Sequence, residues 1–206
     1  MAAGNVVAIV GKNYCSRSQA NLIVRRRPHV VNGGGFVVTN CTDQKVVFRV
    51  DGCGILGTKG ELILRNGDGE PLLLIRRKGG IVQAVSMHRR WKAFKIDYEG
   101  LEKIVFSLDE PTTVSTCLFK NNSIRVIVNP RMMGNKEKWD FEIKGSFTDK
   151  DCSIIDSGGN IVAQVQEGTM SEDVYNVVVQ PGFDQAFVLG VIGILDNIHD
   201  ESTRCN

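Results

Sequence analysis

Three clusters of basic residues give this sequence its clearest capacity for binding chemistry. They lie at residues 25–27, 76–78 and 89–92 of the 206-residue chain. Arginine forks match phosphate and carboxylate oxygens, and lysine adds a compact charge. Side chains alternate along strands, so some of these cations must share a face and could hold a phosphorylated headgroup. The residues predicted to form this anionic headgroup-binding site are Arg76, Arg77, Lys78, Arg89, Arg90 and Lys92.

The charge is unevenly distributed along the chain. Up to Gly100, 16 Lys and Arg stand against 7 Asp and Glu, and from Leu101 onward the numbers are 9 and 16. Such asymmetry can mark a basic binding face, unless the two halves interleave in the fold. The total of +2 is too small to indicate a nucleic-acid partner. An alternative role for the basic clusters is a solvated rim that keeps strand edges from aggregating.

Other residues that could support catalysis or bind a metal lack the necessary spacing. The three histidines, His29, His88 and His199, have no Cys or His ligand pattern beside them. The six cysteines form no CxxC pair and no dense disulfide framework. Residues 52–57 match GxGxxG, but the following residues lead into a strand, whereas a dinucleotide site needs a helix there. We therefore expect no metal, no cofactor and no enzymatic activity.

The elements that must position the basic clusters are short strands joined by tight turns. Gly-containing turns at 66–69 and 156–160 are typical of β-hairpins. About a dozen strands without intervening helices indicate an antiparallel barrel or sandwich in one domain, residues 1–206, with flexible termini at 1–5 and 200–206. The expected strands are 36–40, 46–50, 62–64, 72–75, 91–96, 103–108, 112–119, 124–128, 141–147, 153–155, 161–163 and 174–179.

The end of the chain differs from this pattern. Residues 186–195 are apolar without a break, and Asp184 can cap a helix there. Ten residues span only ~15 Å, about half a bilayer core, so the segment is not transmembrane. A helix that is apolar on every face must be buried on every face. In a protein of strands, this places it inside a closed barrel.

The start of the chain shows no secretory signal. The first five residues lack a basic region, and the apolar run 6–10 is too short for a signal-peptide core. We therefore expect an intracellular, cytoplasmic protein.

Several motifs together resemble the plant LURP-one-related family. The segment 86–94, Ser-Met-His-Arg-Arg-Trp-Lys-Ala-Phe, is similar to that family's SMHxxWxxF pattern. Further matches follow in the family's order at residues 35–39, 47–50, 140–147 and 184–196. The resemblance implies a tubby-like fold, a closed barrel of about twelve antiparallel strands around a hydrophobic C-terminal helix. It also implies a link to plant defence, and tubby domains bind phosphoinositides and can tether a regulator to the plasma membrane.

Two function classes remain open from the sequence. The first is a phosphoinositide-binding or membrane-tethered regulatory domain, peripheral at the plasma membrane, which the basic clusters and the superfamily favour. The second is a protein-interaction module without a lipid ligand, which the near-neutral total charge favours. Fold similarity alone does not decide between them.

Overall fold

Alternation of apolar and polar residues shapes the strands of this protein. In β4 (Glu61–Asn66), for example, Leu62 and Leu64 are buried while the residues between them are partly exposed. One face of each strand therefore faces an apolar interior. The structure, a computed structural model, describes residues 6–28, 34–52, 60–78, 88–96, 100–111, 123–130, 139–168, 171 and 173–203.

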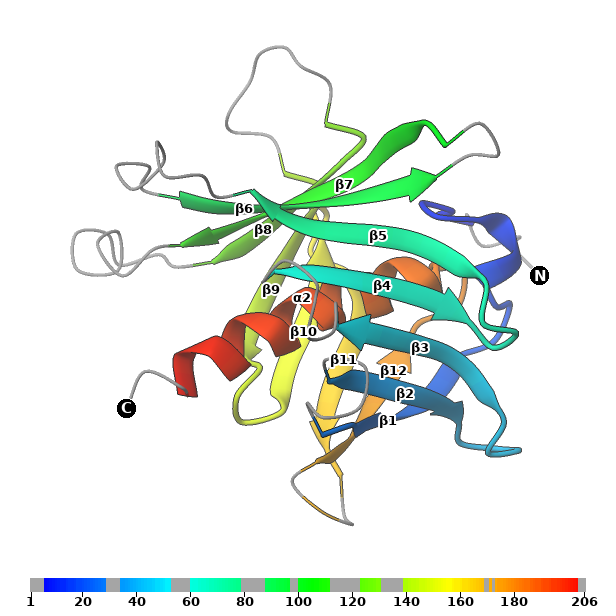
Figure 1. The fold of residues 1–206 in the computed structure, drawn as a ribbon. Coiled ribbons are helices and arrows are strands. Elements are labelled where there is room, and N and C mark those ends of the chain that lie inside the picture. The colour runs from blue at the N-terminus through cyan, green and yellow to red at the C-terminus, as the bar shows by residue number, and fades with distance from the viewer. Residues whose placement is uncertain are drawn as a thin grey trace.

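Twelve antiparallel strands close into a barrel (Figure 1). Strands that follow each other in the chain are neighbours in the barrel, and β1 pairs with β12 to close it. This confirms the predicted closed antiparallel barrel. Besides β4, the strands are β1 (Ala20–Arg26), β2 (Gly35–Asn40), β3 (Val46–Gly52), β5 (Pro71–Lys78), β6 (His88–Ile96), β7 (Glu102–Pro111), β8 (Ile124–Val128), β9 (Phe141–Ser146), β10 (Asp151–Asp156), β11 (Ile161–Glu167) and β12 (Val174–Val179).

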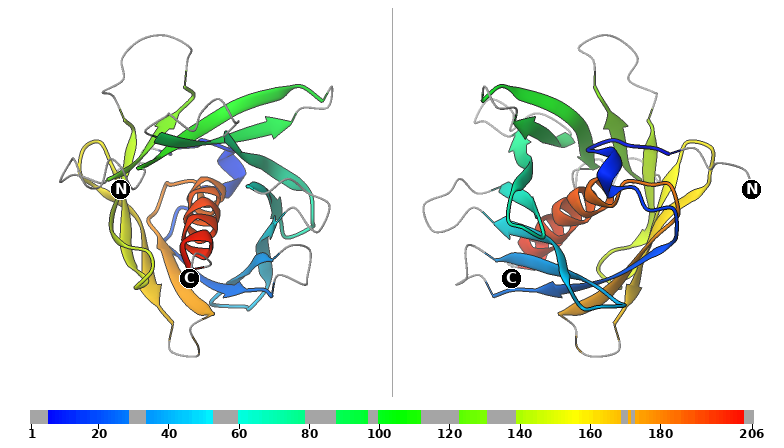
Figure 2. Two further views of the ribbon diagram at one scale, coloured as in Figure 1. Left: turned by 60° about the vertical axis from the view of Figure 1, so that its left-hand side comes forward. Right: turned by 90° about the vertical axis from the view of Figure 1, so that its right-hand side faces the viewer.

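The apolar helix α2 (Gln185–Thr203) lies inside the barrel, as predicted (Figure 2). Residues 186–196 are all buried, which satisfies the requirement that every face be covered. Phe187 packs against Phe106 of β7 and Phe141 of β9, with ring centroids 5.2 and 4.8 Å apart. The helix is longer than its apolar run and continues through Thr203.

Asp184 joins the start of this helix to the N-terminal segment. Its Oδ1 accepts hydrogen bonds from the backbone N–H groups of Ala186 and Phe187, at 3.0 and 3.2 Å, so it caps the helix as expected. Its Oδ2 accepts three more from residues 9–11, at 2.7–3.0 Å. The carboxylate is fully buried. A short 3₁₀ turn, η1 (Lys12–Tyr14), follows these residues and leads the chain toward β1.

An ion pair ties α2 to β1 where the apolar run of the helix ends. The Nη2 atom of Arg26 lies 2.6 Å from Oδ1 of Asp196, whose side chain is 8% exposed. The apolar run of the helix is therefore held by a polar contact on either side of it and by apolar packing between them.

The structure differs from the expected strand set at one element. Strand β1 was not predicted, because its basic end was interpreted only as a charge cluster. Its alternation is nevertheless clear, with Leu22 and Val24 buried inside the barrel. The strand expected at 112–119 and most of the Gly-rich segment 52–57 lie outside the described residues, as do 1–5 and 204–206.

The two helix glycines should respond differently to alanine. A Cβ on Gly190 would lie 3.2 Å from Leu73 and Phe106, whereas one on Gly193 would have its nearest contact, Val50, at 3.5 Å. We expect Gly193→Ala to gain up to about 1 kcal/mol of helix propensity. Gly190→Ala should be less stable than Gly193→Ala by roughly 1–3 kcal/mol, because the core there is overpacked. Urea unfolding measures both, and equal effects would contradict the described seating of α2.

Replacing Asp184 should damage the fold severely. Asp184→Ala leaves five N–H groups without their acceptor, three of them in buried hydrogen bonds, and we expect a loss of at least about 3 kcal/mol. Asp184→Asn keeps one acceptor oxygen and should lose less. Asp149→Ala, at an exposed turn, is the matched control. Free energies of unfolding that match this control for either Asp184 variant would refute the capping role.

Candidate anion-binding surface

Strand register brings together four of the six predicted site residues. Arg76 lies opposite Lys92, and Lys78 lies opposite Arg90, on the neighbouring strands β5 and β6. Residues that alternate with Arg76, Arg90 and Lys92 along these strands are buried in the core. Arg76, Arg90 and Lys92 therefore belong to the outer face of the barrel.

The other two predicted residues take the alternate positions. Arg77 lies opposite Trp91, which is fully buried, and Arg89 lies opposite Glu110. The alternation of a strand thus places them away from Arg76 and Arg90. The register does not gather all six cations into one cluster.

Two of the arginines already form ion pairs with carboxylates of the protein. Arg76 donates from Nε to Glu61, at 2.8 Å, and from Nη1 to Glu102, at 2.7 Å. Arg90 donates from Nη2 to Oδ2 of Asp109, at 3.0 Å. This hydrogen bonding raises the pKa of Arg90 above its usual value. A ligand for these guanidinium groups must compete with acids that the fold supplies.

The Arg90 pair is part of an ionic row across four strands. Asp109 of β7 lies opposite Arg125 of β8, which lies opposite Glu142 of β9. Nε of Arg125 is 3.6 Å from Oε1 of Glu142, and its guanidinium lies 5.9 Å from the ring centre of Trp139. Opposite charges on facing strands stabilise a sheet modestly. Arg90 therefore has a structural role as well as a candidate binding role.

An apolar row borders the basic positions on the outer face. Its members are opposite partners on successive strands from β4 to β7. Ile63 lies opposite Leu74, Leu74 opposite Phe94, and Phe94 opposite Ile104. All four are partly exposed, and none belongs to the core cluster or packs against it. Two positions along the strands from this row lie Arg76 and Lys92.

The tryptophan of the 86–94 motif serves the core. Trp91 is fully buried, and its Nε1 donates a hydrogen bond to Glu110, at 3.3 Å. Phe94 belongs to the outer apolar row instead. The motif thus combines a core anchor with an outward-facing aromatic residue.

Sequence reasoning passed over Arg49 and Arg65 as site candidates. They occupy outer positions of β3 and β4, directly opposite each other. Being isolated in the sequence, they form no visible cluster. Apolar and polar residues alternate along β3 and β4, and the two strands pair with each other. Together these two features could have identified Arg49 and Arg65 from the sequence.

Metal-ligand clusters and membrane-spanning helices are not found in the described part of the chain. No group of three or more His, Cys, Asp or Glu side chains there is arranged to hold a metal ion. None of the described helices has the length and apolar character needed to cross a membrane. Cys15, Cys41 and Cys152 are free thiols, and burial raises the pKa of Cys152 to about 11.

A closed twelve-stranded antiparallel barrel around one buried C-terminal helix defines a protein of the tubby-like fold class. The sequence profile of the LURP-one-related family matches residues 20–196. The chain belongs to this family.

Individual relatives agree with this assignment. Protein LURP-one-related 6 of Arabidopsis thaliana is 54% identical over 198 residues, covering 96% of this chain and 99% of its own. Protein LURP-one-related 16 of the same plant is 50% identical over 208 residues, covering 96% and 95%. The X-ray structure of an Arabidopsis thaliana protein, 22% identical, matches with a TM-score of 0.65 over 93% of this chain and 98% of that one, which supports the fold.

The Arg90–Asp109 pair should behave as a surface ion pair. A double-mutant cycle with Arg90→Gln and Asp109→Asn should give a coupling of about 0.2–1 kcal/mol that falls as salt is added. Thermal and urea unfolding measure it. A coupling several times larger would mean that the guanidinium is too tightly held to serve a ligand.

Proposed function

We propose that this protein is a non-enzymatic regulatory domain that attaches to anionic membrane surfaces and contacts phosphorylated headgroups, such as those of phosphoinositides. The contact face is the outer face of β4–β6. In this proposal the protein is intracellular and peripheral at the plasma membrane. A link to plant defence is part of the proposal and rests on the family resemblance alone.

The observation that carries the proposal is the position of the apolar row beside cations. Ile63, Leu74 and Phe94 cross three strands, with Arg76 and Lys92 along one side and Arg65 along the other. Apolar side chains that enter the headgroup region, flanked by cations that meet anionic lipid, are typical of interfacial membrane binding. Each cation near such a surface contributes about 1 kcal/mol.

The carboxylates on this face set how strongly it can bind. Glu61 and Glu102 hold Arg76, and Asp109 holds Arg90, in fixed positions on the surface. Held guanidinium groups lose less side-chain freedom when a headgroup arrives. The same acids repel an anionic surface, so the face should require a multiply charged lipid.

A protein-interaction module without a lipid ligand is the second candidate function. The ion pairs at Arg76 and Arg90 favour it, because they already neutralise two cations of the predicted site. The apolar row would then contact a protein partner. Membrane binding assays separate the two functions.

The test is co-sedimentation with phosphatidylcholine vesicles that do or do not contain phosphatidylinositol bisphosphate. The triple variant Arg76→Gln, Arg90→Gln, Lys92→Gln should lose affinity by roughly a hundredfold, at about 1 kcal/mol per cation. Asp109→Asn should bind more tightly than the unaltered protein, because it removes a competing anion.

The control is a matched triple change to Gln at Lys12, Lys45 and Lys144, which are exposed and lie outside this face. It should change affinity little. Equal losses from both triple variants would indicate diffuse attraction. Absence of binding by the unaltered protein would refute the membrane proposal and favour the interaction module.

A further inference from the structure

The outer face of β1 to β4 carries positive charge that its described acids do not fully balance. In register, Arg25 of β1 lies opposite Val37 of β2, which lies opposite Arg49 of β3, which lies opposite Arg65 of β4. Asp51 is the one acidic residue at the described outward positions of β1–β3, and Glu61 of β4 pairs with Arg76. Cations therefore exceed anions here, whereas Arg76 and Arg90 of the predicted site each have an acid beside them.

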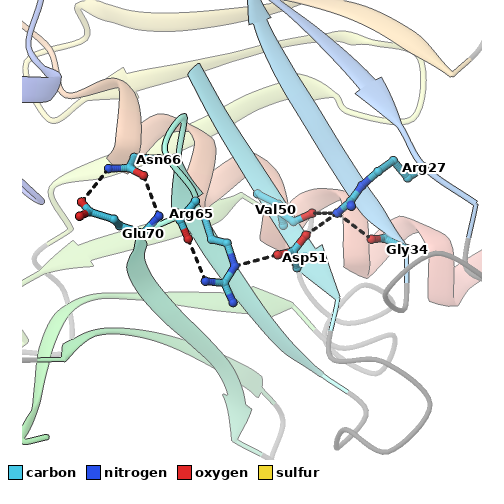
Figure 3. A network of polar contacts seen from close by, with 8 residues as sticks. Arg27, Gly34, Val50, Asp51, Arg65, Asn66 and Glu70 are labelled. Carbon is cyan, nitrogen blue, oxygen red and sulfur yellow. Dashed lines mark hydrogen bonds and ion pairs between the residues drawn. The ribbon is translucent and has the colours of Figure 1, made fainter. Parts of the chain in front are cut away.

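Both oxygens of Asp51 bind other arginines. Asp51 accepts from Nη2 of Arg27 through Oδ1, at 2.6 Å, and from Nε of Arg65 through Oδ2, at 2.9 Å (Figure 3). Nη2 of Arg27 also donates to the carbonyl oxygens of Val50 and Gly34, at 2.8 and 3.3 Å. Arg49 makes no hydrogen bond or ion pair with Asp51.

Arg25 and Arg49 stand outside this network. Both are exposed, and within the described residues neither makes an ion pair or a side-chain hydrogen bond. Arg65 uses Nε for Asp51 and Nη1 for the carbonyl oxygen of Gly69, at 3.0 Å, so Nη2 has no partner among the described residues. Three guanidinium groups in one row thus retain donors for a ligand.

The position of Arg49 opposite Arg65 also lowers the stability of the sheet, and the fold does not require arginine at both positions. Like charges directly opposite each other on facing strands destabilise a sheet, and Arg49 faces Arg65 in this way. Departures from such rules concentrate at functional sites. Asp51, 2.9 Å from Nε of Arg65, offsets part of this repulsion, and the uncharged neighbours Ile23, Val37 and Thr39 on the same face do not add to the relief.

We infer that Arg25, Arg49 and Arg65 form a second anion-binding site, which takes a compact ligand bearing two or more phosphoryl groups. Opposite residues on neighbouring strands are ~5 Å apart, and residues two strands apart are ~10 Å apart. A ligand with two or more phosphoryl groups can contact more than one of these arginines, and each phosphoryl group offers acceptor oxygens and negative charge to arginine forks. The site shares Arg65 of β4 with the proposed membrane face, but Arg25 and Arg49 lie on β1 and β3, outside that face, so the site can be tested separately from the membrane proposal. The same groups occur in free polyphosphorylated molecules and in lipid headgroups.

Titration with inorganic tripolyphosphate, followed by calorimetry, tests this site. The double variant Arg25→Gln, Arg49→Gln should weaken binding by roughly 25-fold, about fivefold for each arginine. Arg125→Gln, on the outer face of β8 and 3.6 Å from Glu142, is the matched control and should change binding less than twofold. Arg49→Gln alone should keep or raise the melting temperature, because it removes the repulsion with Arg65.

Each other outcome overturns the inference. These outcomes are no binding by the unaltered protein, unchanged binding by the double variant, equal losses from Arg125→Gln, or a fall in melting temperature for Arg49→Gln, which would make the residue structural. A second arm uses vesicles with phosphatidylinositol bisphosphate. Loss of vesicle binding in the double variant identifies a lipid headgroup as the source, whereas loss for tripolyphosphate alone identifies a free anion. Tripolyphosphate binding without any vesicle binding would refute the membrane proposal and leave this site intact.

Discussion

The burial of one carboxylate makes the rest of this architecture possible. A helix inside a barrel must begin in an environment without water, where its first N–H groups would be costly to leave unpaired. One carboxylate oxygen of Asp184 accepts hydrogen bonds from two of these N–H groups. Its other oxygen accepts hydrogen bonds from the backbone N–H groups of residues 9–11, which lie at that end of the barrel. The same side chain therefore starts the helix and anchors the N-terminal segment, from residues about as far apart in sequence as the chain allows.

Because α2 occupies the barrel axis, the chemistry of this protein belongs to its outer surface. Residues 186–196 fill the interior with apolar packing, and the inward strand positions serve that packing. Binding then depends on which side chains the register sets beside one another outside. On β4–β9 the register sets Arg76 beside Glu61 and Arg90 beside Asp109, although it also sets Arg76 opposite Lys92. On β1–β4 it sets arginine against arginine.

The sequence was sufficient for the fold because its signals are local. Apolar alternation and hairpin turns predicted most strands, and the unbroken apolar run with Asp184 before it predicted a buried, capped helix. Strand β1 showed the same alternation at Leu22 and Val24 but was hidden by its basic end. The site was harder to predict, because ion pairing is a property of register. The residues near Arg76 in the chain do not indicate that it pairs with Glu102, which lies two strands away and 26 residues later. The second set of contacts to Asp184 could not be foreseen for the same reason.

The order of the strands converts the uneven charge of the sequence into an uneven charge in space. Since neighbours in the chain are neighbours in the barrel, the basic first half forms one arc, β1–β6, and the acidic second half forms the other, β7–β12. The two arcs meet at two seams. At β6–β7 the seam carries charges of both signs, and Arg90 meets Asp109 there. At β1–β12 the acidic arc contributes a strand with no charged residue, Val174–Val179, so Arg25 faces Val174 and finds no acid. Arg90 therefore has an acidic partner at one seam, whereas Arg25 has none among the described residues at the other. A count of basic residues along the chain cannot show this difference, because it depends on which strands the register brings together.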